Sequence, residues 1–140
     1  MARRIFAEDT IDVAGSPDRV FAVLSDVAHY PEWWPAELRV RHLGGGEVEV
    51  RPPASRFRCR LGDGEPPHWL TVHYVDGPQR GDGIWTLQAL PHGATRVSYR
   101  IDLEPHGVIA RLLSVWMDFP AIHSRQMRPV LQALARRVAN

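Results

Sequence analysis

The chain has 140 residues, 44% of them hydrophobic, which suits one domain covering residues 1–140 with a core of its own. Its formal net charge is +1, and all 17 Lys and Arg positions are arginine. The absence of lysine excludes Schiff-base catalysis and a lysine-containing phosphate loop. A near-neutral balance also speaks against nucleic acid as the main partner, because phosphate binding needs a clear excess of positive charge.

The sequence has no sign of a membrane span or an export signal. No apolar run approaches the ~20 residues that cross a bilayer, and the opening MARRIFAED lacks the apolar segment of a secretory signal. The one cysteine, Cys59, cannot form an intrachain disulfide, which agrees with a reducing compartment. We therefore expect a cytoplasmic protein without stable membrane insertion.

The first predicted elements are a strand, a helix and a short second helix. Apolar and polar residues alternate over residues 4–13, which is the period of a half-buried strand. In AGSPDRVFAVLSD, Ser16 can cap a helix and Pro17 can occupy its first turn, ahead of an apolar stripe. The following HYPEWWP, residues 29–35, is bounded by prolines and predicts a short helix or turn.

Residues 37–103 are predicted to form six short strands. Turn-forming glycine, proline and aspartate separate the segments ELRVRHL, EVEVR, RFRCRL, HWLTVHYV, IWTLQAL and TRVSYRIDL. Such closely spaced strands pair antiparallel in sequence order, as a meander. The first strand, residues 4–13, is then free to pair at an edge of the sheet.

Residues 105–140 hold the longest helical pattern of the chain. Apolar residues recur there at steps of three and four, and most arginines fall on the opposite face. This pattern predicts one long amphipathic helix. Pro120 and Pro129 each remove a backbone donor, so we expect a kink, or a break near Asp118 that splits a short helix from the long one.

Two stretches resemble a known superfamily. IDVAGSPDRVFAVLSDVAHYPEWWP combines a strand, a turn of small residues and proline, a helix and a YPxW element. GATRVSYRIDLEPHGVIARLL combines the last strand with the entry into the C-terminal helix. Both resemble the START-like (SRPBCC) superfamily in its polyketide cyclase/dehydrase and lipid-transport branch, and the resemblance covers nearly the whole chain.

This resemblance implies an α+β helix-grip fold. In that fold a curved, seven-stranded antiparallel sheet wraps around a long C-terminal helix, two short helices follow the first strand, and an internal cavity lies between sheet and helix. The family includes lipid carriers, aromatase/cyclases, coenzyme Q-binding proteins and stress-related proteins. Its motifs therefore predict the fold better than the function.

Candidate ligand-binding residues are those expected to face this cavity. Trp33 and Trp34 are adjacent and cannot both point the same way, and Tyr30 lies one helical turn before them. One tryptophan is expected in the core or cavity and the other nearer its mouth, and the alternation does not decide which. The full set is Tyr30, Trp33, Trp34, Trp69, His73, Trp85, Tyr99, Trp116, Phe119, His123 and Met127.

His123 is the best candidate for a catalytic residue. It lies in the apolar stripe of the C-terminal helix, between Phe119 and Met127. A buried imidazole needs a hydrogen-bond partner, so His123 is either a core histidine bonded within the fold or a cavity group that binds a ligand or moves a proton. Asp9 and His42 interrupt apolar phases of their strands and could be its partners.

The strand HWLTVHYV has apolar residues on both of its faces. One face would carry Leu70, Val72 and Tyr74, and the other Trp69 and His73. The pattern alone does not decide which face is buried. We take Trp69 and His73 to face the cavity, with an outward His73 as the alternative.

The arginines of RFRCRL and ELRVRHL alternate with apolar residues and are expected on the solvent face. The resemblance implies that the aromatase/cyclase branch uses an arginine inside its pocket. No arginine falls on an inward phase here, unless a bulge shifts the register by one residue and brings Arg58 inside.

Metal and cofactor sites are not expected. His68 and His73 are five residues apart on a strand and point to opposite faces, and no histidine pair has HExxH spacing. The GGG of residues 44–46 precedes no helix, so it predicts a turn and not a phosphate loop.

Three hypotheses for the function follow. The first is a carrier or sensor that encloses one lipophilic or aromatic small molecule. The second is an aromatase/cyclase that holds a poly-β-ketone chain while a histidine or tyrosine moves a proton during aldol closure and dehydration. The third is a protein-interaction module without a functional cavity.

Overall fold

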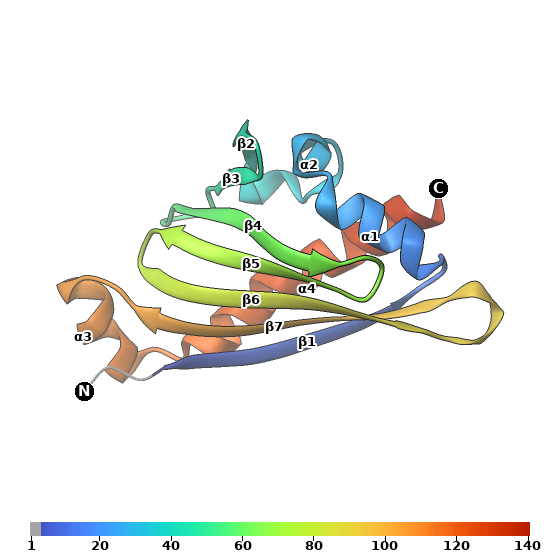
Figure 1. Ribbon diagram of the computed structural model, residues 1–140. Coiled ribbons are helices and arrows are strands. Elements are labelled where there is room, and N and C mark those ends of the chain that lie inside the picture. Colours follow the sequence, from blue (N-terminus) through green and yellow to red (C-terminus); the bar gives the residue numbers. More distant parts are fainter. Residues whose placement is uncertain (1–3) are drawn as a thin grey trace.

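A seven-stranded antiparallel sheet forms the main body of the molecule (Figure 1). The computed structural model describes residues 4–140. Its strands are β1 (Ile5–Val13), β2 (Arg41–Gly44), β3 (Glu47–Val50), β4 (Phe57–Glu65), β5 (Trp69–Asp76), β6 (Gln79–Ala89) and β7 (Thr95–Pro105). Their order across the sheet is β1-β7-β6-β5-β4-β3-β2, so β2 to β7 form the predicted meander and β1 pairs with β7 at the edge.

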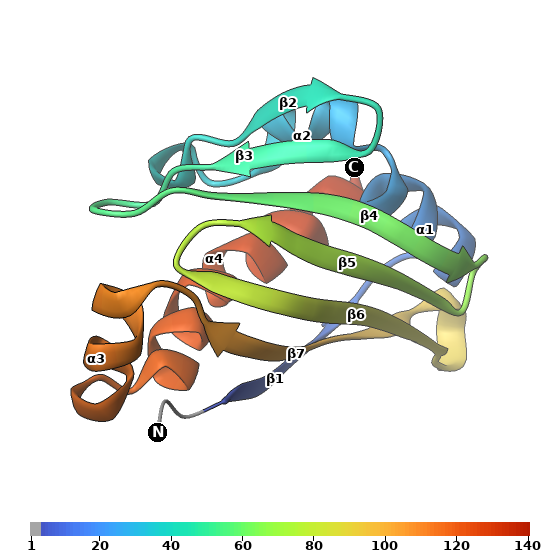
Figure 2. The same ribbon diagram turned by 60° about the vertical axis from the view of Figure 1, so that its left-hand side comes forward.

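Helices lie on one face of this sheet and beside its ends (Figure 2). They are α1 (Pro17–Ser25), α2 (Tyr30–Trp33), α3 (Val108–Trp116) and α4 (Phe119–Ala139), with 3-10 turns η1 (Val27–His29), η2 (Ala36–Leu38) and η3 (Pro91–Gly93). The long helix α4 runs along the sheet, and α1 and α2 pack near its C-terminal end. This α+β arrangement of a sheet held against a long C-terminal helix is the predicted fold.

Helix α1 forms for the local reasons that the sequence indicated. The Ser16 hydroxyl accepts a hydrogen bond from the Arg19 backbone N–H at 3.2 Å, and Pro17 occupies the first turn. Val20 and Leu24, one turn apart, are both fully buried.

The C-terminal segment forms two helices, in agreement with the predicted alternative of a break near Asp118. The Asp118 carboxylate accepts a hydrogen bond from the Ala121 backbone N–H at 3.2 Å, and Pro120 occupies the first turn of α4. The new helix therefore starts at Phe119. Because the chain changes direction there, Trp116 leaves the apolar stripe of α4 and its side chain is 86% exposed at the end of α3. Helix α4 continues through Pro129.

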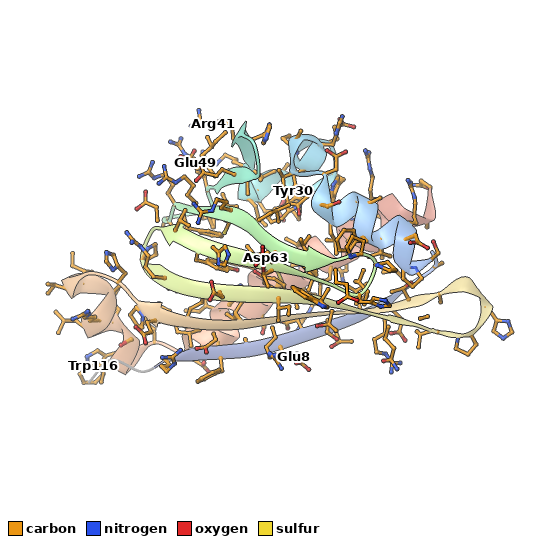
Figure 3. All side chains as sticks on the ribbon, in the orientation of Figure 1. Glu8, Tyr30, Arg41, Glu49, Asp63 and Trp116 are labelled. Carbon is orange, nitrogen blue, oxygen red and sulfur yellow. The ribbon has the colours of Figure 1, made fainter. Side chains whose placement is uncertain are left out.

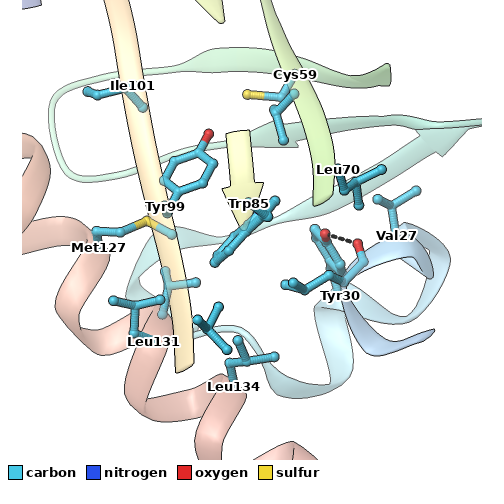
Figure 4. Packing of buried hydrophobic residues seen from close by; sticks show 14 of the residues in the cluster. Val27, Tyr30, Cys59, Leu70, Trp85, Tyr99, Ile101, Met127, Leu131 and Leu134 are labelled. Atoms are coloured by element: carbon cyan, nitrogen blue, oxygen red, sulfur yellow. Dashed lines mark hydrogen bonds between the residues drawn. The ribbon is translucent and has the colours of Figure 1, made fainter. Parts of the chain in front are cut away.

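The core lies between the sheet and α4 (Figure 4). It includes Leu103 and Val97 of β7 and Val130 and Leu134 of α4, and all four are buried almost completely. Alternate residues of β7 are buried along its whole length, as expected of a strand with one face on the core.

Strand β5 faces the core with Leu70, Val72 and Tyr74. The prediction that Trp69 and His73 face the cavity was therefore wrong. The sheet register gives the reason, because directly paired residues share a face: Leu70 pairs with Trp85, and Trp85 with Tyr99, which are both buried. His73 pairs with Asp82 on the outer face, where their side chains lie 2.6 Å apart.

Candidate ligand-binding site

A small inner chamber of about 60 Å³ lies between the sheet and α4. Its wall is almost entirely apolar and aromatic, with His123 and Gln126 as the polar exceptions on α4. Six of the predicted ligand-binding residues line it: Tyr30, Trp34, Trp85, Tyr99, His123 and Met127.

The chamber adjoins a larger outer groove of about 670 Å³. The groove is bounded by residues 53–55, by the turn between β5 and β6, and by α3, which lies beside this end of the sheet (Figure 2). Phe57, Tyr74, His123 and Gln126 line both spaces. One elongated molecule can therefore occupy the groove and extend one end into the chamber.

A chain of hydrogen bonds connects β7, β5 and α4 across the chamber wall. The Tyr99 and Tyr74 hydroxyls lie 2.8 Å apart, and the Tyr74 hydroxyl lies 3.3 Å from Nε2 of His123. The His123 ring also stacks on the Tyr99 ring, with centroids 6.1 Å apart. Gly83 leaves room for this arrangement, because a Cβ there would come within 2.3 Å of the Tyr99 hydroxyl.

Burial decides the protonation state of these groups. Desolvation lowers the pKa of His123 from 6.5 to about 4, and the Asp9 carboxylate opposes this only partly. The same effect raises the pKa of Tyr74 and of Tyr99, so both hydroxyls keep their protons at neutral pH. Burial also raises the pKa of the Cys59 thiol and makes it a poor nucleophile. At neutral pH the chamber wall is therefore uncharged.

Two nitrogen atoms of the chamber wall are buried without a hydrogen-bond partner among residues 4–140. They are Nε1 of Trp34, which can only donate, and Nδ1 of His123, whose role depends on the tautomer. An unsatisfied buried polar group costs about 1–3 kcal/mol. Both atoms therefore keep a hydrogen-bonding capacity that the described residues do not use.

The structure separates the two adjacent tryptophans. Trp34 lines the chamber and stacks on the buried Tyr30 ring, with centroids 5.1 Å apart. The Tyr30 hydroxyl is satisfied by the Leu24 carbonyl, which it donates to. Trp33 contacts Tyr30 edge-on and borders a different surface hollow, beside Arg137. Trp34 is thus the ring that can touch a ligand in the chamber.

The sequence matches the polyketide cyclase/dehydrase and lipid transport family over residues 4–139. The chain belongs to this family. Among solved structures it is similar to the ZhuI aromatase/cyclase from Streptomyces, at 20% identity and a TM-score of 0.76, over 98% of this chain and 94% of that chain. It is also similar to a START superfamily protein from Mycobacterium smegmatis, at 14% identity and a TM-score of 0.74, over 96% and 97%.

Norcoclaurine synthase from Thalictrum flavum shares the fold as well, at 11% identity and a TM-score of 0.70, over 99% of this chain and 88% of that chain. No curated protein matches the sequence. At these identities the solved structures establish the polyketide cyclase/dehydrase fold and leave the ligand to be inferred from the site.

Not every predicted site residue reaches the cavity of this polyketide cyclase/dehydrase family member. Phe119 lines the outer groove, but Trp116 points to solvent, and Trp69 lies on the outer side of the sheet. The proposed partners of His123 do not hydrogen-bond to it: Asp9 accepts from Ser124 at 3.0 Å, and His42 bonds to the Gly45 carbonyl at 2.8 Å.

Of the four residues that line both spaces, three escaped the sequence analysis: Phe57, Tyr74 and Gln126. Tyr74 was considered but placed on the wrong face of β5. Phe57 alternates with outward arginines and could have been found from that pattern. Gln126 lies one turn after His123 on α4, and a polar residue at that spacing was a signal that went unused.

An arginine inside the pocket, which resemblance to the aromatase/cyclase branch implied, is missing from the chamber wall in the part of the chain that the structure describes. A register shift between Arg58 and Cys59 does occur against β5. It nevertheless leaves Cys59 buried on the chamber side and Arg58 half-buried beside Glu47, 4.0 Å away.

Residues 4–140 contain no group of three His, Cys, Asp or Glu side chains placed to hold a metal ion. Over the same residues, no helix has the length and apolarity needed to cross a membrane.

Proposed function

We propose that this protein binds one apolar small molecule that contains an aromatic ring and a carbonyl or phenol oxygen. The observation that carries this proposal is the pair of unsatisfied nitrogens, Trp34 Nε1 and His123 Nδ1, in an otherwise apolar chamber. The Trp34 N–H can only donate, so it favours a ligand oxygen that accepts. Apolar burial would supply most of the affinity, and the two nitrogens would fix the orientation.

The sizes of the two spaces support an elongated ligand. The chamber is much smaller than the groove, so it suits the oxygen-bearing end of the molecule, and the groove suits its apolar body. Aromatic side chains line the chamber on several sides, and their faces and edges suit an aromatic ring. Binding of one ligand in these two spaces is sufficient for a carrier or a sensor.

Native mass spectrometry of the protein purified from its own host tests the binding proposal directly. We expect a bound small molecule that is released on denaturation and absorbs in the aromatic range. Uptake of the uncharged dye N-phenylnaphthylamine, which brightens in apolar sites, gives an independent measure of an accessible cavity. Absence of both a bound molecule and dye uptake would overturn the proposal.

The hydrogen-bond chain favours one second candidate, an aromatase/cyclase. In the tautomer whose Nε2–H donates to Tyr74, the neutral His123 Nδ1 can take a proton from the carbon between two ketones of a poly-β-ketone. The resulting carbanion forms a carbon–carbon bond with a further carbonyl, and the imidazolium returns the proton to the alkoxide. Loss of water then completes the aromatic ring.

Turnover of a poly-β-ketone thioester distinguishes this candidate from a carrier. His123→Ala should abolish the formation of cyclised product, while His29→Ala, on an exposed histidine that lines neither the chamber nor the groove, should leave it unchanged. If wild-type protein binds the thioester without converting it, the enzyme hypothesis is excluded and the carrier hypothesis stands.

A further inference from the structure

Among the residues that the structure describes, no Arg, Asp or Glu side chain lines the binding site. These types make up 24% of the chain, yet none of them lines the chamber or the groove. On β3, Val48 and Val50 line the chamber, and Glu49 between them lies on the opposite face of the sheet. Arg51, 2.9 Å away, and Arg41, 3.4 Å away, pair with Glu49 there, and Figure 3 shows Arg41 and Glu49 together. The charges of this edge of the sheet are thus paired away from the site.

The titratable side chains of the chamber wall carry no charge at neutral pH. They are Tyr30, Cys59, Tyr74, Tyr99 and His123. Burial raises the pKa of the three tyrosines and of the thiol, and it lowers the pKa of the imidazole. The Asp9 carboxylate acts on His123 from outside the wall, where it accepts a hydrogen bond from Ser124 at 3.0 Å. The groove adds the exposed His106. The chamber therefore offers no charge that could balance an ionised ligand.

A neutral hydroxyl group suits the two unsatisfied nitrogens of the wall better than an ionised oxygen does. It can accept from the Trp34 N–H, and it can serve Nδ1 of His123 in either tautomer, because a hydroxyl both donates and accepts. A phenolate or carboxylate oxygen only accepts, so it leaves Nδ1 unsatisfied in the tautomer whose Nε2–H donates to Tyr74. Such an oxygen would also enter an apolar space without a counter-charge, which strongly disfavours the ionised form.

Building on the proposed function, we infer that the site selects its ligand by charge: it takes a neutral phenol or ketone and excludes a phenolate or carboxylate of similar skeleton. A weakly acidic phenol therefore binds with its proton attached and dissociates as the pH rises through the pKa of the phenol. Ionised fatty acids fall outside this ligand class, even though the groove of about 670 Å³ would suit their apolar chains.

A chlorinated phenol and its methyl ether test this inference. The only oxygen of 2,4-dichlorophenol ionises, and its phenolate absorbs at longer wavelength than the phenol, whereas 2,4-dichloroanisole cannot ionise. Each compound is used to displace N-phenylnaphthylamine from wild-type protein, at pH values below and above the pKa of the phenol. The Kd of the phenolate should be at least about tenfold higher than the Kd of the phenol. The Kd of the anisole should change less than about twofold, which controls for titration of protein groups such as His106.

Two arginine substitutions on α4 form a matched pair. Gln126→Arg places a positive charge on a residue that lines both spaces, so the Kd of the phenolate should fall at least about fivefold. Gln132→Arg makes the same change on an exposed residue of the same helix that lines neither space, and it should leave the Kd of every probe unchanged. A further measurement needs no variant. At the pH where the free phenol is half ionised, adding wild-type protein should convert the phenolate absorption band into the phenol band.

Three results would overturn the inference and leave the proposed function intact. The first is a phenolate that displaces the dye from wild-type protein as well as the phenol does, and the second is a neutral phenol that does not displace the dye at all. The third is an equal affinity of wild-type and Gln126→Arg protein for the phenolate, because charge would then not decide the binding. Failure of both N-phenylnaphthylamine and the anisole to bind wild-type protein would instead overturn the proposed function.

Discussion

At the scale of single residues, the burial of His123 makes stability depend on pH. Above pH 6.5 the imidazole is neutral in both the folded and the unfolded chain. Between pH 6.5 and about 4, the unfolded chain binds a proton that the folded chain does not, so the free energy of unfolding falls as the pH falls. The full loss from this group is about 3 kcal/mol.

This cost predicts the behaviour of His123→Gln. The variant should lose less stability than the wild type between neutral pH and pH 4.5, because glutamine takes up no proton in either state. Urea denaturation at several pH values, followed by tryptophan fluorescence, measures the difference. Parallel pH profiles for the two proteins would show that His123 is not neutral and buried as described.

The two tyrosines of the hydrogen-bond chain are not equivalent, since Tyr74 is its middle member. Tyr74→Phe removes the contacts of both neighbours and should lower the free energy of unfolding by about 1–3 kcal/mol. Tyr99→Phe removes only the end of the chain, so it should cost less. Thermal or urea denaturation measures the loss of unfolding free energy in each variant. An equal loss would contradict the central position of Tyr74 in the hydrogen-bond chain.

At the scale of elements, α3 and α4 have opposite relations to the core. Helix α4 buries an apolar face against the sheet, whereas α3 exposes most of its large apolar side chains and buries Ala110 and Ser114. Three of the exposed residues, Val108, Ile109 and Leu113, also border the outer groove. Helix α3 therefore contributes more to the wall of the groove than to the core of the fold.

Two leucine substitutions measure this difference. Leu134→Ala in α4 removes a fully buried side chain and should cost about 2–5 kcal/mol. Leu112→Ala in α3 changes a side chain that is 63% exposed and should cost less than about 0.5 kcal/mol. Urea denaturation of both variants gives the comparison. A similar cost at the two positions would mean that α3 packs as tightly as α4.

At the scale of the whole molecule, the chamber exists only because α2, the sheet and α4 close around it. Trp34→Ala should therefore weaken the binding of N-phenylnaphthylamine at least about fivefold, because it removes one wall of the chamber. Trp33→Ala, on a ring that borders another hollow, should reduce stability and leave dye affinity within about twofold. Fluorescence titration of both variants decides, and an equal loss of affinity would contradict the assignment of Trp34 alone to the chamber wall.

The sequence by itself determined the fold, because local signals and periodicity agree along the chain. Ser16 and Pro17 mark a helix start, alternation marks β1 and β7, and Asp118 with Pro120 marks the break between α3 and α4. These features depend on residues close in sequence.

Only the tertiary structure decided which residues meet in the site. Strand β5 is apolar on both faces, so its buried face depends on the pairing of Leu70 with Trp85 in the next strand. Trp33 and Trp34 are chemically identical neighbours, and their different packing on the Tyr30 ring separates them. The chain from Tyr99 through Tyr74 to His123 joins residues far apart in sequence, and no local pattern records a contact of that kind.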